Sequence, residues 1–132
     1  MFAPLFQVAL GGAIGAVARY GTGVALTRAL GRPEIGVLPL PVIVVNVVGS
    51  FLMGVLVVYA SARGLTHLTP FLMTGLLGGF TTFSAFSLET VVLFERGQVG
   101  AAALYVLLSV GLSILGLVVG LWMARAMIGV GT

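Results

Sequence analysis

Four apolar segments, each long enough to cross a lipid bilayer as a helix, make up most of the chain. They cover approximately residues 6–27, 38–62, 72–94 and 100–123. A hydrocarbon core about 30 Å thick is spanned by about 20 predominantly apolar residues in a helix. Charged residues account for only 7% of the chain, compared with about 25% in soluble domains, so they cannot cover a water-soluble fold. We therefore expect an all-α membrane protein in which residues 1–132 form a single domain of four transmembrane helices.

Short polar segments separate these spans, at residues 28–34, 61–67 and 95–98. Loops of this length join antiparallel neighbours in helical bundles. Residues 42–48 are rich in β-branched side chains, but they lie within a longer apolar segment that lacks alternation, which favours a helix over a strand. The first apolar segment has no basic residues ahead of it and is longer than a signal-peptide core, so we expect it to remain as a helix.

Composition also excludes several kinds of site. Cysteine is absent, which removes disulfides, thiolate metal sites and thiol nucleophiles. The isoelectric point of 10.2 results from six arginines against three glutamates, without a basic run, so nucleic-acid binding is not expected. The single histidine, His67, lies in a loop, and the chain has no aspartate, so no acid–base pair points to an enzyme.

The arginines give almost no signal for membrane orientation. With four spans, Arg63 and Arg125 lie on the side of the termini, while the other side carries Arg28, Arg32 and Arg96. An excess of arginine normally marks the cytoplasmic side, and two against three is hardly an excess. Two interpretations are equally consistent with this count. The chain inserts in both directions and forms an antiparallel dimer, or a weak bias or a partner sets a single orientation.

Small residues at four-residue spacing suggest close helix packing. Such pairs let helix backbones approach each other in lipid, and they occur at Gly11 with Gly15, Ser50 with Gly54, Gly75 with Gly79, and Gly116 with Gly120. Because the chain contains 20 glycines, some pairs arise by chance, and we interpret any single pair as general packing. Four short spans leave little material for a pore within one subunit, so we expect an oligomer.

The third span has an unusual middle, with the sequence GGFTTFSAFS at residues 78–87. Two glycines and two threonines lower its helix propensity. Either the helix is broken near mid-membrane, which frees carbonyls for a cation and amides for an anion, or it is intact and the glycines serve packing. Phe83 and Phe86 share one helical face, and the positive edges of their rings can meet an anion. Phenylalanines in membrane helices more commonly pack or face lipid.

Uncharged polar side chains occur in two other spans. Tyr105, Ser109 and Ser113 follow each other at four-residue intervals, which places three hydroxyls along one helical face. Asn46 adds an amide with two donor hydrogens. Donors without fixed charge suit an ion that must bind weakly enough to leave. Interhelical hydrogen bonding is the alternative, and for these residues considered alone it is favoured.

Two segments together identify a family resemblance. NVVGSF at residues 46–51, followed by GGFTTFSAFSLE at residues 78–89, closely resembles the Fluc (CrcB-type) fluoride channels. Gly12, Gly15 and the pair Arg19-Tyr20 also fit the opening pattern of that family. The resemblance extends over the whole chain in length, helix count and motif placement.

This resemblance implies a function and a set of site residues. It implies an antiparallel, dual-topology homodimer in the prokaryotic plasma (inner) membrane, with two pores that export cytoplasmic fluoride passively. Arg19 matches a vestibule arginine, and Glu89 matches an acidic position beyond the helix break. The backbone carbonyls of Gly78 and Thr81 match those that hold a structural sodium ion (Na+) at the dimer centre. The pore positions of the family match Asn46, Phe83, Phe86, Tyr105, Ser109 and Ser113.

One departure and two alternatives qualify the resemblance. Many family members read Gly-Thr-Leu where this chain has Pro41-Val42-Ile43, so a hydroxyl is missing at Val42. A small multidrug-resistance-type exporter has similar length and helix count, but it needs a carboxylate in the first helix. Here the acidic residues are Glu34 and Glu95 in loops and Glu89 near the end of the third span. A non-conducting accessory subunit is the second alternative.

Overall fold

The computed structural model describes residues 2–31 and 34–129. In that part of the chain, four helical segments are long and apolar enough to cross a membrane. They are α1 (Phe2–Leu30), α2 (Leu40–Ala62), a third segment (Thr66–Glu95) and α5 (Val99–Ile128). The predicted all-α membrane fold with four spans is therefore confirmed. Arg32, counted above in the first loop, lies outside the described residues.

The third segment consists of several helical pieces of different geometry. It begins with the 3₁₀-helix η1 (Thr66–Leu68) and the π-helix η2 (Pro70–Leu77), and continues with α3 (Gly78–Phe80) and α4 (Phe83–Glu95). Between α3 and α4 the backbone is extended, with φ −84° and ψ 161° at Thr81 and φ −152° and ψ 123° at Thr82. Helical geometry resumes at Phe83 because the Thr82 hydroxyl caps α4, accepting a hydrogen bond of 3.2 Å from the Ala85 N–H.

A small hairpin that the sequence analysis did not anticipate precedes α2. Its strands β1 (Glu34–Ile35) and β2 (Leu38–Pro39) are antiparallel, and Glu34 pairs with Pro39. Gly36 turns the chain with φ 65°, a conformation that glycine adopts at little cost. The second helix, expected from about residue 38, therefore begins two residues later, at Leu40.

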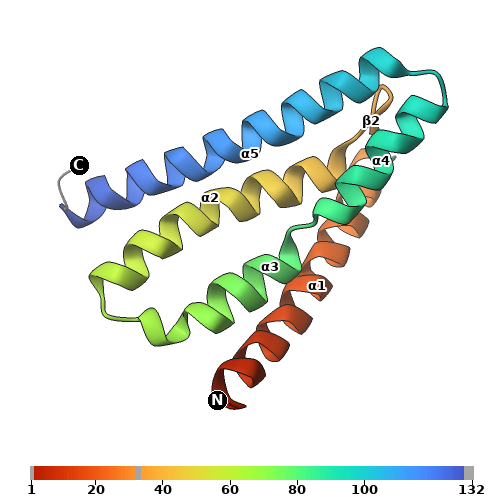
Figure 1. The fold of residues 1–132 in the computed structure, drawn as a ribbon. Helices are drawn as coiled ribbons and strands as arrows, with labels where there is room; N and C mark the ends of the chain where they lie inside the picture. Colours follow the sequence, from red (N-terminus) through yellow and green to blue (C-terminus); the bar gives the residue numbers. More distant parts are fainter. Residues whose placement is uncertain (1, 32–33, 130–132) are drawn as a thin grey trace.

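Two helix pairs organise the molecule (Figure 1). α2 packs along α5, while α1 packs along η2 and α3, and α4 packs on the beginning of α5. The described part of α1 does not pack along α5, so the four spans do not close into a compact bundle. The buried core lies where α2, α4 and α5 meet, and it contains Val42, Ile43, Phe86, Leu93, Ala102 and Tyr105.

Glycines hold α1 against the third segment at backbone contact distance. A Cβ atom added to Gly15 would lie 2.8 Å from the Phe80 nitrogen, and one added to Gly79 would lie 2.6 Å from the Gly12 carbonyl oxygen. Real Cβ atoms essentially never approach other atoms this closely. Only glycine therefore fits here, and the packing role predicted for the Gly11–Gly15 and Gly75–Gly79 pairs is confirmed.

The contact between α2 and α5 is built in the same way. A Cβ atom on Gly54 would lie 2.8 Å from the Leu121 nitrogen, and one on Gly116 would lie 3.1 Å from the Val47 carbonyl oxygen. Gly120 is closer still to the Phe51 carbonyl. The predicted packing of the Gly116–Gly120 pair is thus confirmed as well. Ser50, expected to pack together with Gly54, lines a groove instead.

Candidate functional site

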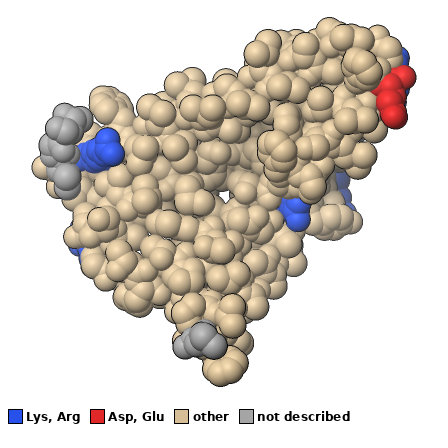
Figure 2. Space-filling view, in the orientation of Figure 1, with Lys and Arg blue, Asp and Glu red and all other residues tan. Residues whose placement is uncertain are grey.

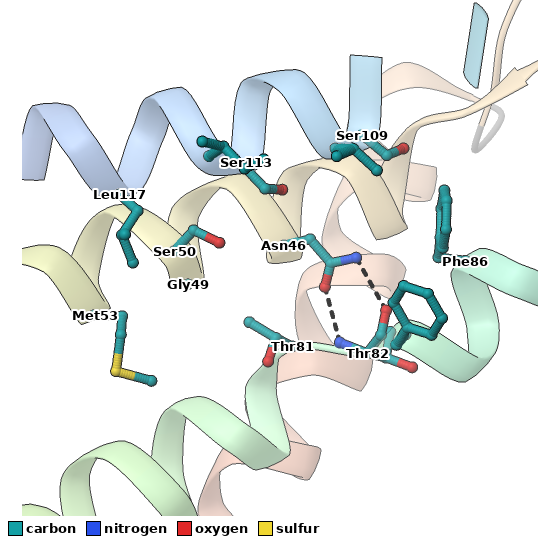
Figure 3. A pocket seen from close by; sticks show the side chains of 13 residues that line it. Asn46, Gly49, Ser50, Met53, Thr81, Thr82, Phe86, Ser109, Ser113 and Leu117 are labelled. Carbon is teal, nitrogen blue, oxygen red and sulfur yellow. Dashed lines mark hydrogen bonds between the residues drawn. The ribbon is translucent and has the colours of Figure 1, made fainter. Parts of the chain in front are cut away.

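An open groove with a volume of about 340 Å³ lies between α2, α5 and the extended residues before α4 (Figure 3). Among the described residues, no charged side chain lines it. Figure 2 shows the same face as Figure 1, largely uncharged and hollowed near its middle. The lining consists of Asn46, Gly49, Ser50, Met53, Thr81, Thr82, Phe83, Phe86, Ser109, Val110, Ser113, Ile114 and Leu117.

The Asn46 side-chain amide hydrogen-bonds to both the N–H and the carbonyl of Thr82, in the extended segment (Figure 3). Its Nδ2 group donates to the Thr82 carbonyl oxygen at 3.0 Å, and its Oδ1 atom accepts from the Thr82 N–H at 2.8 Å. Buried backbone groups need partners, and the Thr82 N–H, at the N-cap before the first turn of α4, finds one in the Asn46 side chain. An asparagine amide has two N–H hydrogens, and the described residues accept a hydrogen bond from one of them. The second hydrogen remains available on a side chain that lines the groove.

Two serine hydroxyls on α5 are buried and have no hydrogen-bond partner among the described residues. They belong to Ser109 and Ser113, which both line the groove. A buried hydroxyl without a partner costs about 1–3 kcal/mol, and folding alone gives no reason for two of them side by side. Their donors and lone pairs are therefore not used by the described part of the chain, and both residues border the groove. The interhelical hydrogen bonds considered as the alternative are not formed by these hydroxyls within the described chain.

Phe83 and Phe86 both line the groove but differ in exposure. Phe83, the first residue of α4, is 76% exposed, whereas Phe86 is 8% exposed. Their ring centroids are 5.3 Å apart with an interplanar angle of 54°, and the Phe86 ring lies 5.6 Å from the Tyr105 ring. Phe86 is fixed by packing, while the Phe83 ring is exposed at the surface of the chain.

Tyr105 does not line the groove, although it belongs to the same hydroxyl stripe as Ser109 and Ser113. Its side chain is completely buried, and its hydroxyl donates a hydrogen bond to Glu89 Oε2. Glu89 also lines a second cavity of about 270 Å³ beside the hairpin, together with Glu34 and Arg96. The tyrosine hydroxyl is thus committed to a carboxylate on α4.

We expect Tyr105→Phe to lower the free energy of unfolding by about 1–3 kcal/mol, because Glu89 loses its buried donor. The phenylalanine ring preserves the contact with Phe86. A double-mutant cycle with Glu89→Ala, which removes the acceptor, followed by thermal unfolding in detergent, measures the coupling between the two side chains. Additive losses for the two substitutions would show that the hydrogen bond does not stabilise the fold.

The remaining predicted site residues lie at different places. Arg19 is half-buried on α1 and does not line the groove. The Thr81 hydroxyl donates to the Leu77 carbonyl at 2.9 Å, and Gly78 is exposed. Val42, where the family hydroxyl is missing, is buried in the core and does not line the groove either.

Sequence reasoning gave Thr82 and Ser50 no part in the site. The sequence around Thr82 contained a local signal, because a threonine directly before an apolar helical segment is typical of a helix N-cap. In the structure its hydroxyl accepts a hydrogen bond from the Ala85 N–H. The sequence contained no signal for the pairing of Thr82 with Asn46, since the two residues are separated by 36 positions.

Among the described residues, no group of three or more His, Cys, Asp or Glu side chains gathers to hold a metal. A cation in this part of the chain would therefore need other oxygen atoms.

Comparisons with known proteins agree with the membrane character of the fold. The family model described as CrcB-like protein, camphor resistance (CrcB), matches residues 6–121. A protein of Jannaschia sp. is 69% identical over 101 residues, which cover 76% of this chain and 96% of that protein. One of Roseobacter denitrificans is 60% identical over 121 residues, covering 92% and 94% of the two chains. One of Ruegeria sp. is 58% identical over 128 residues, covering 97% and 99%. All three are named fluoride-specific ion channel FluC.

Proposed function

Because this chain belongs to the CrcB-like protein family, we propose that it is a fluoride-selective channel through which cytoplasmic fluoride leaves the cell passively. The names of its relatives supply the ion. The observation that carries the proposal is a groove lined by two serines, Ser109 and Ser113, whose buried hydroxyls have no partner, and by no charged side chain, among residues 2–31 and 34–129. We place the channel in the bacterial inner membrane, consistent with the four apolar helices and the bacterial relatives.

In this mechanism, fluoride exchanges its water for weak protein donors. The free Asn46 N–H and the hydroxyls of Ser109 and Ser113 donate hydrogen bonds, and the edges of Phe83 and Phe86 present positive partial charge. In the described part of the chain, the groove is lined by no arginine or lysine that would hold the ion tightly. An ion that binds several weak sites in turn can move down its gradient, as conduction requires.

A second copy of the chain is part of the proposal. The groove is open on one side of the protomer, and the exposed Phe83 ring projects there. An antiparallel copy related by two-fold symmetry would close both grooves, which gives two pores per dimer. The extended Thr81–Thr82 backbone would then lie near mid-membrane, inside the assembly and away from lipid. The nearly equal arginine count on the two sides supports insertion in both orientations.

Backbone oxygens near this extended segment fit a structural sodium ion. Because the Thr82 N–H donates to Asn46, it does not close a helical hydrogen bond with the Gly78 carbonyl. Similarly, the Ala85 N–H donates to the Thr82 hydroxyl, which leaves the Thr81 carbonyl free of that helical bond. Carbonyl oxygens of unwound helices are suitable Na+ ligands. Such an ion would hold Gly78 and Thr81 of the two protomers together at the dimer centre.

Fluoride efflux from liposomes tests the proposed function directly. Purified protein is reconstituted with internal fluoride, the membrane potential is short-circuited with a potassium ionophore, and the released fluoride is measured with a selective electrode. We expect rapid efflux of fluoride without comparable release of chloride. Intact, dimeric protein that releases no fluoride would instead support a non-conducting accessory subunit.

Ser109→Ala separates a pore role from a packing role. Since the Ser109 hydroxyl has no partner among the described residues, its removal should leave the unfolding temperature unchanged or slightly raised. Fluoride efflux should fall by about tenfold, equivalent to about 1.4 kcal/mol for one lost donor. Thr27→Ala, whose hydroxyl is exposed in α1 and bonded to the Gly23 carbonyl, serves as the control. A destabilised Ser109→Ala protein with normal efflux would assign the serine to packing.

Membrane orientation is tested with a reporter enzyme that is active on only one side of the membrane. Fused to the C-terminus, it should show that comparable fractions of the chain end on each side. Adding arginines beside Arg63 should move most chains into one orientation, because the natural bias is small. Reporter activity on one side only in the unmodified fusion would reject the antiparallel dimer.

A further inference from the structure

Another groove, distinct from the two described above, lies between the C-terminal ends of α2 and α5, far from the hairpin. It has a volume of about 330 Å³ and is lined by Val57, Val58, Ser61, Ala62, Leu121 and Arg125. We propose that this groove binds an anionic phospholipid, whose phosphate meets Arg125 and Ser61 while an acyl chain lies along the aliphatic side chains. Neither the family resemblance nor the proposed fluoride path assigns a role to these residues.

The lining of this groove is apolar toward the middle of the helices and polar at their ends. A phospholipid has the same order, with apolar acyl chains inside the membrane and a polar headgroup at its surface. Val57 and Leu121 lie one turn before Ser61 and Arg125 on their respective helices. Ser61 is in the last turn of α2, and Arg125 is in the last turn of α5, so both polar groups are near the helix ends. A phosphate with an attached acyl chain fills both halves of such a groove. A free hydrated phosphate would gain nothing from the aliphatic half.

Aromatic residues place this groove at the depth of the lipid headgroups. Trp122, next to Leu121, is 65% exposed, and Tyr59, two residues before Ser61, is 42% exposed. Tryptophan and tyrosine concentrate at membrane–water interfaces, where their polar atoms reach water and their rings reach the acyl chains. The Arg63 guanidinium lies 5.4 Å from the centre of the Tyr59 ring, which adds a second cation at this level.

The charges at this end of the molecule favour an anion. Glu34 lies in the hairpin before α2, and the 21 helical steps from Leu40 to Ser61 separate that end of α2 from Ser61 by about 32 Å at 1.5 Å per residue. Glu89 and Glu95 lie on α4, which packs on the beginning of α5. Arg125 lies in the last turn of α5, at the opposite end of that helix. The three glutamates are all the acidic residues of the chain. Among the described residues, no glutamate therefore lies beside Arg125, and a lipid phosphate supplies a negative charge there.

Lipid binding to the purified full-length protein in detergent tests the proposal by native mass spectrometry. Phosphatidylglycerol is the anionic probe, and phosphatidylcholine of the same chain length is the zwitterionic one. One cation at an anionic membrane surface contributes about fivefold in binding, so we expect phosphatidylglycerol to bind about fivefold more tightly. Arg125→Gln should remove this preference, and Arg125→Lys should retain most of it. Arg28→Gln, a control at the exposed end of α1, should leave it unchanged.

Three outcomes would overturn the proposal. One is an unchanged lipid preference in Arg125→Gln. Another is loss of bound phosphatidylglycerol when inorganic phosphate is added at millimolar concentration, which would identify a site for the free anion. The third is a fall in fluoride efflux in Arg125→Gln, equal in anionic and zwitterionic liposomes, with lipid binding unaffected. That result would assign Arg125 to the ion path. Because lipid binding is measured without fluoride, its failure and a failure of the proposed channel function are distinguishable.

Discussion

Replacing Gly15 with alanine is expected to lower the free energy of unfolding by at least about 3 kcal/mol, near the upper end of the range for overpacked sites. The added Cβ would lie 2.8 Å from the Phe80 nitrogen and closer still to the Leu76 carbonyl. Both atoms belong to backbone, so no side-chain rotation relieves the contact. The whole of α1 must move away from the third segment, and thermal unfolding in detergent measures the cost.

Gly21→Ala is the matched control for this prediction. Gly21 lies on the same helix, less than two turns further along, and a Cβ there would meet nothing within 4 Å. Alanine has a higher helix propensity than glycine by up to about 1 kcal/mol, so Gly21→Ala should be neutral or slightly stabilising. Equal unfolding temperatures for the two variants would contradict the close backbone contact between α1 and η2.

Replacing Asn46 with aspartate is expected to reduce fluoride efflux by at least about 100-fold. A carboxylate and a fluoride ion 4 Å apart repel each other by about 4 kcal/mol at an effective dielectric constant of about 20. Each 1.4 kcal/mol is a factor of ten, so this estimate leaves a wide margin. The aspartate keeps an acceptor for the Thr82 N–H but loses the donor to the Thr82 carbonyl. Efflux is measured on protein that elutes from size-exclusion chromatography as a single peak at the position of the unmodified protein.

Two further variants show whether the loss of efflux in Asn46→Asp comes from the added charge or from the loss of the asparagine at this position. Asn46→Ala removes the side-chain partner of both backbone groups of Thr82, and we expect it to lower the free energy of unfolding by about 1–3 kcal/mol, because the Thr82 N–H is left without an acceptor. Gln98→Glu adds the same charge outside the groove, at the N-terminal end of α5, and efflux should stay within about twofold of the original rate. A folded Asn46→Asp channel with normal efflux would show that fluoride does not pass this side chain.

Gly15 and Asn46 differ in how much of their structural role can be predicted from the sequence. Gly15 belongs to a pair that the four-residue spacing identified in advance, because two backbones can touch only where both side chains are small. Its partner could not be identified, since spacing gives the face of a helix and does not say which other helix covers it. The contact of Gly11 and Gly15 with η2 required the tertiary structure.

The sequence predicted the candidate site only in part. It selected Asn46, Phe86, Ser109 and Ser113, which the structure brings together around one groove. It also placed Tyr105 in the hydroxyl stripe by periodicity. Periodicity cannot show that a nearer acceptor on another helix, Glu89, takes up that hydroxyl. Whether these residues conduct fluoride remains the prediction tested by the efflux experiments.

The sequence by itself determined that this chain crosses a membrane four times, because hydrophobic length and scarcity of charge are properties of each segment taken alone. The extended backbone at Thr82 is held by Asn46, 36 residues earlier, which hydrogen-bonds to both the N–H and the carbonyl of Thr82. Likewise, the exposure of Phe83 and the burial of Phe86 depend on what packs against α4. Only the tertiary structure decided these features, since each depends on atoms that are distant along the chain and meet after folding.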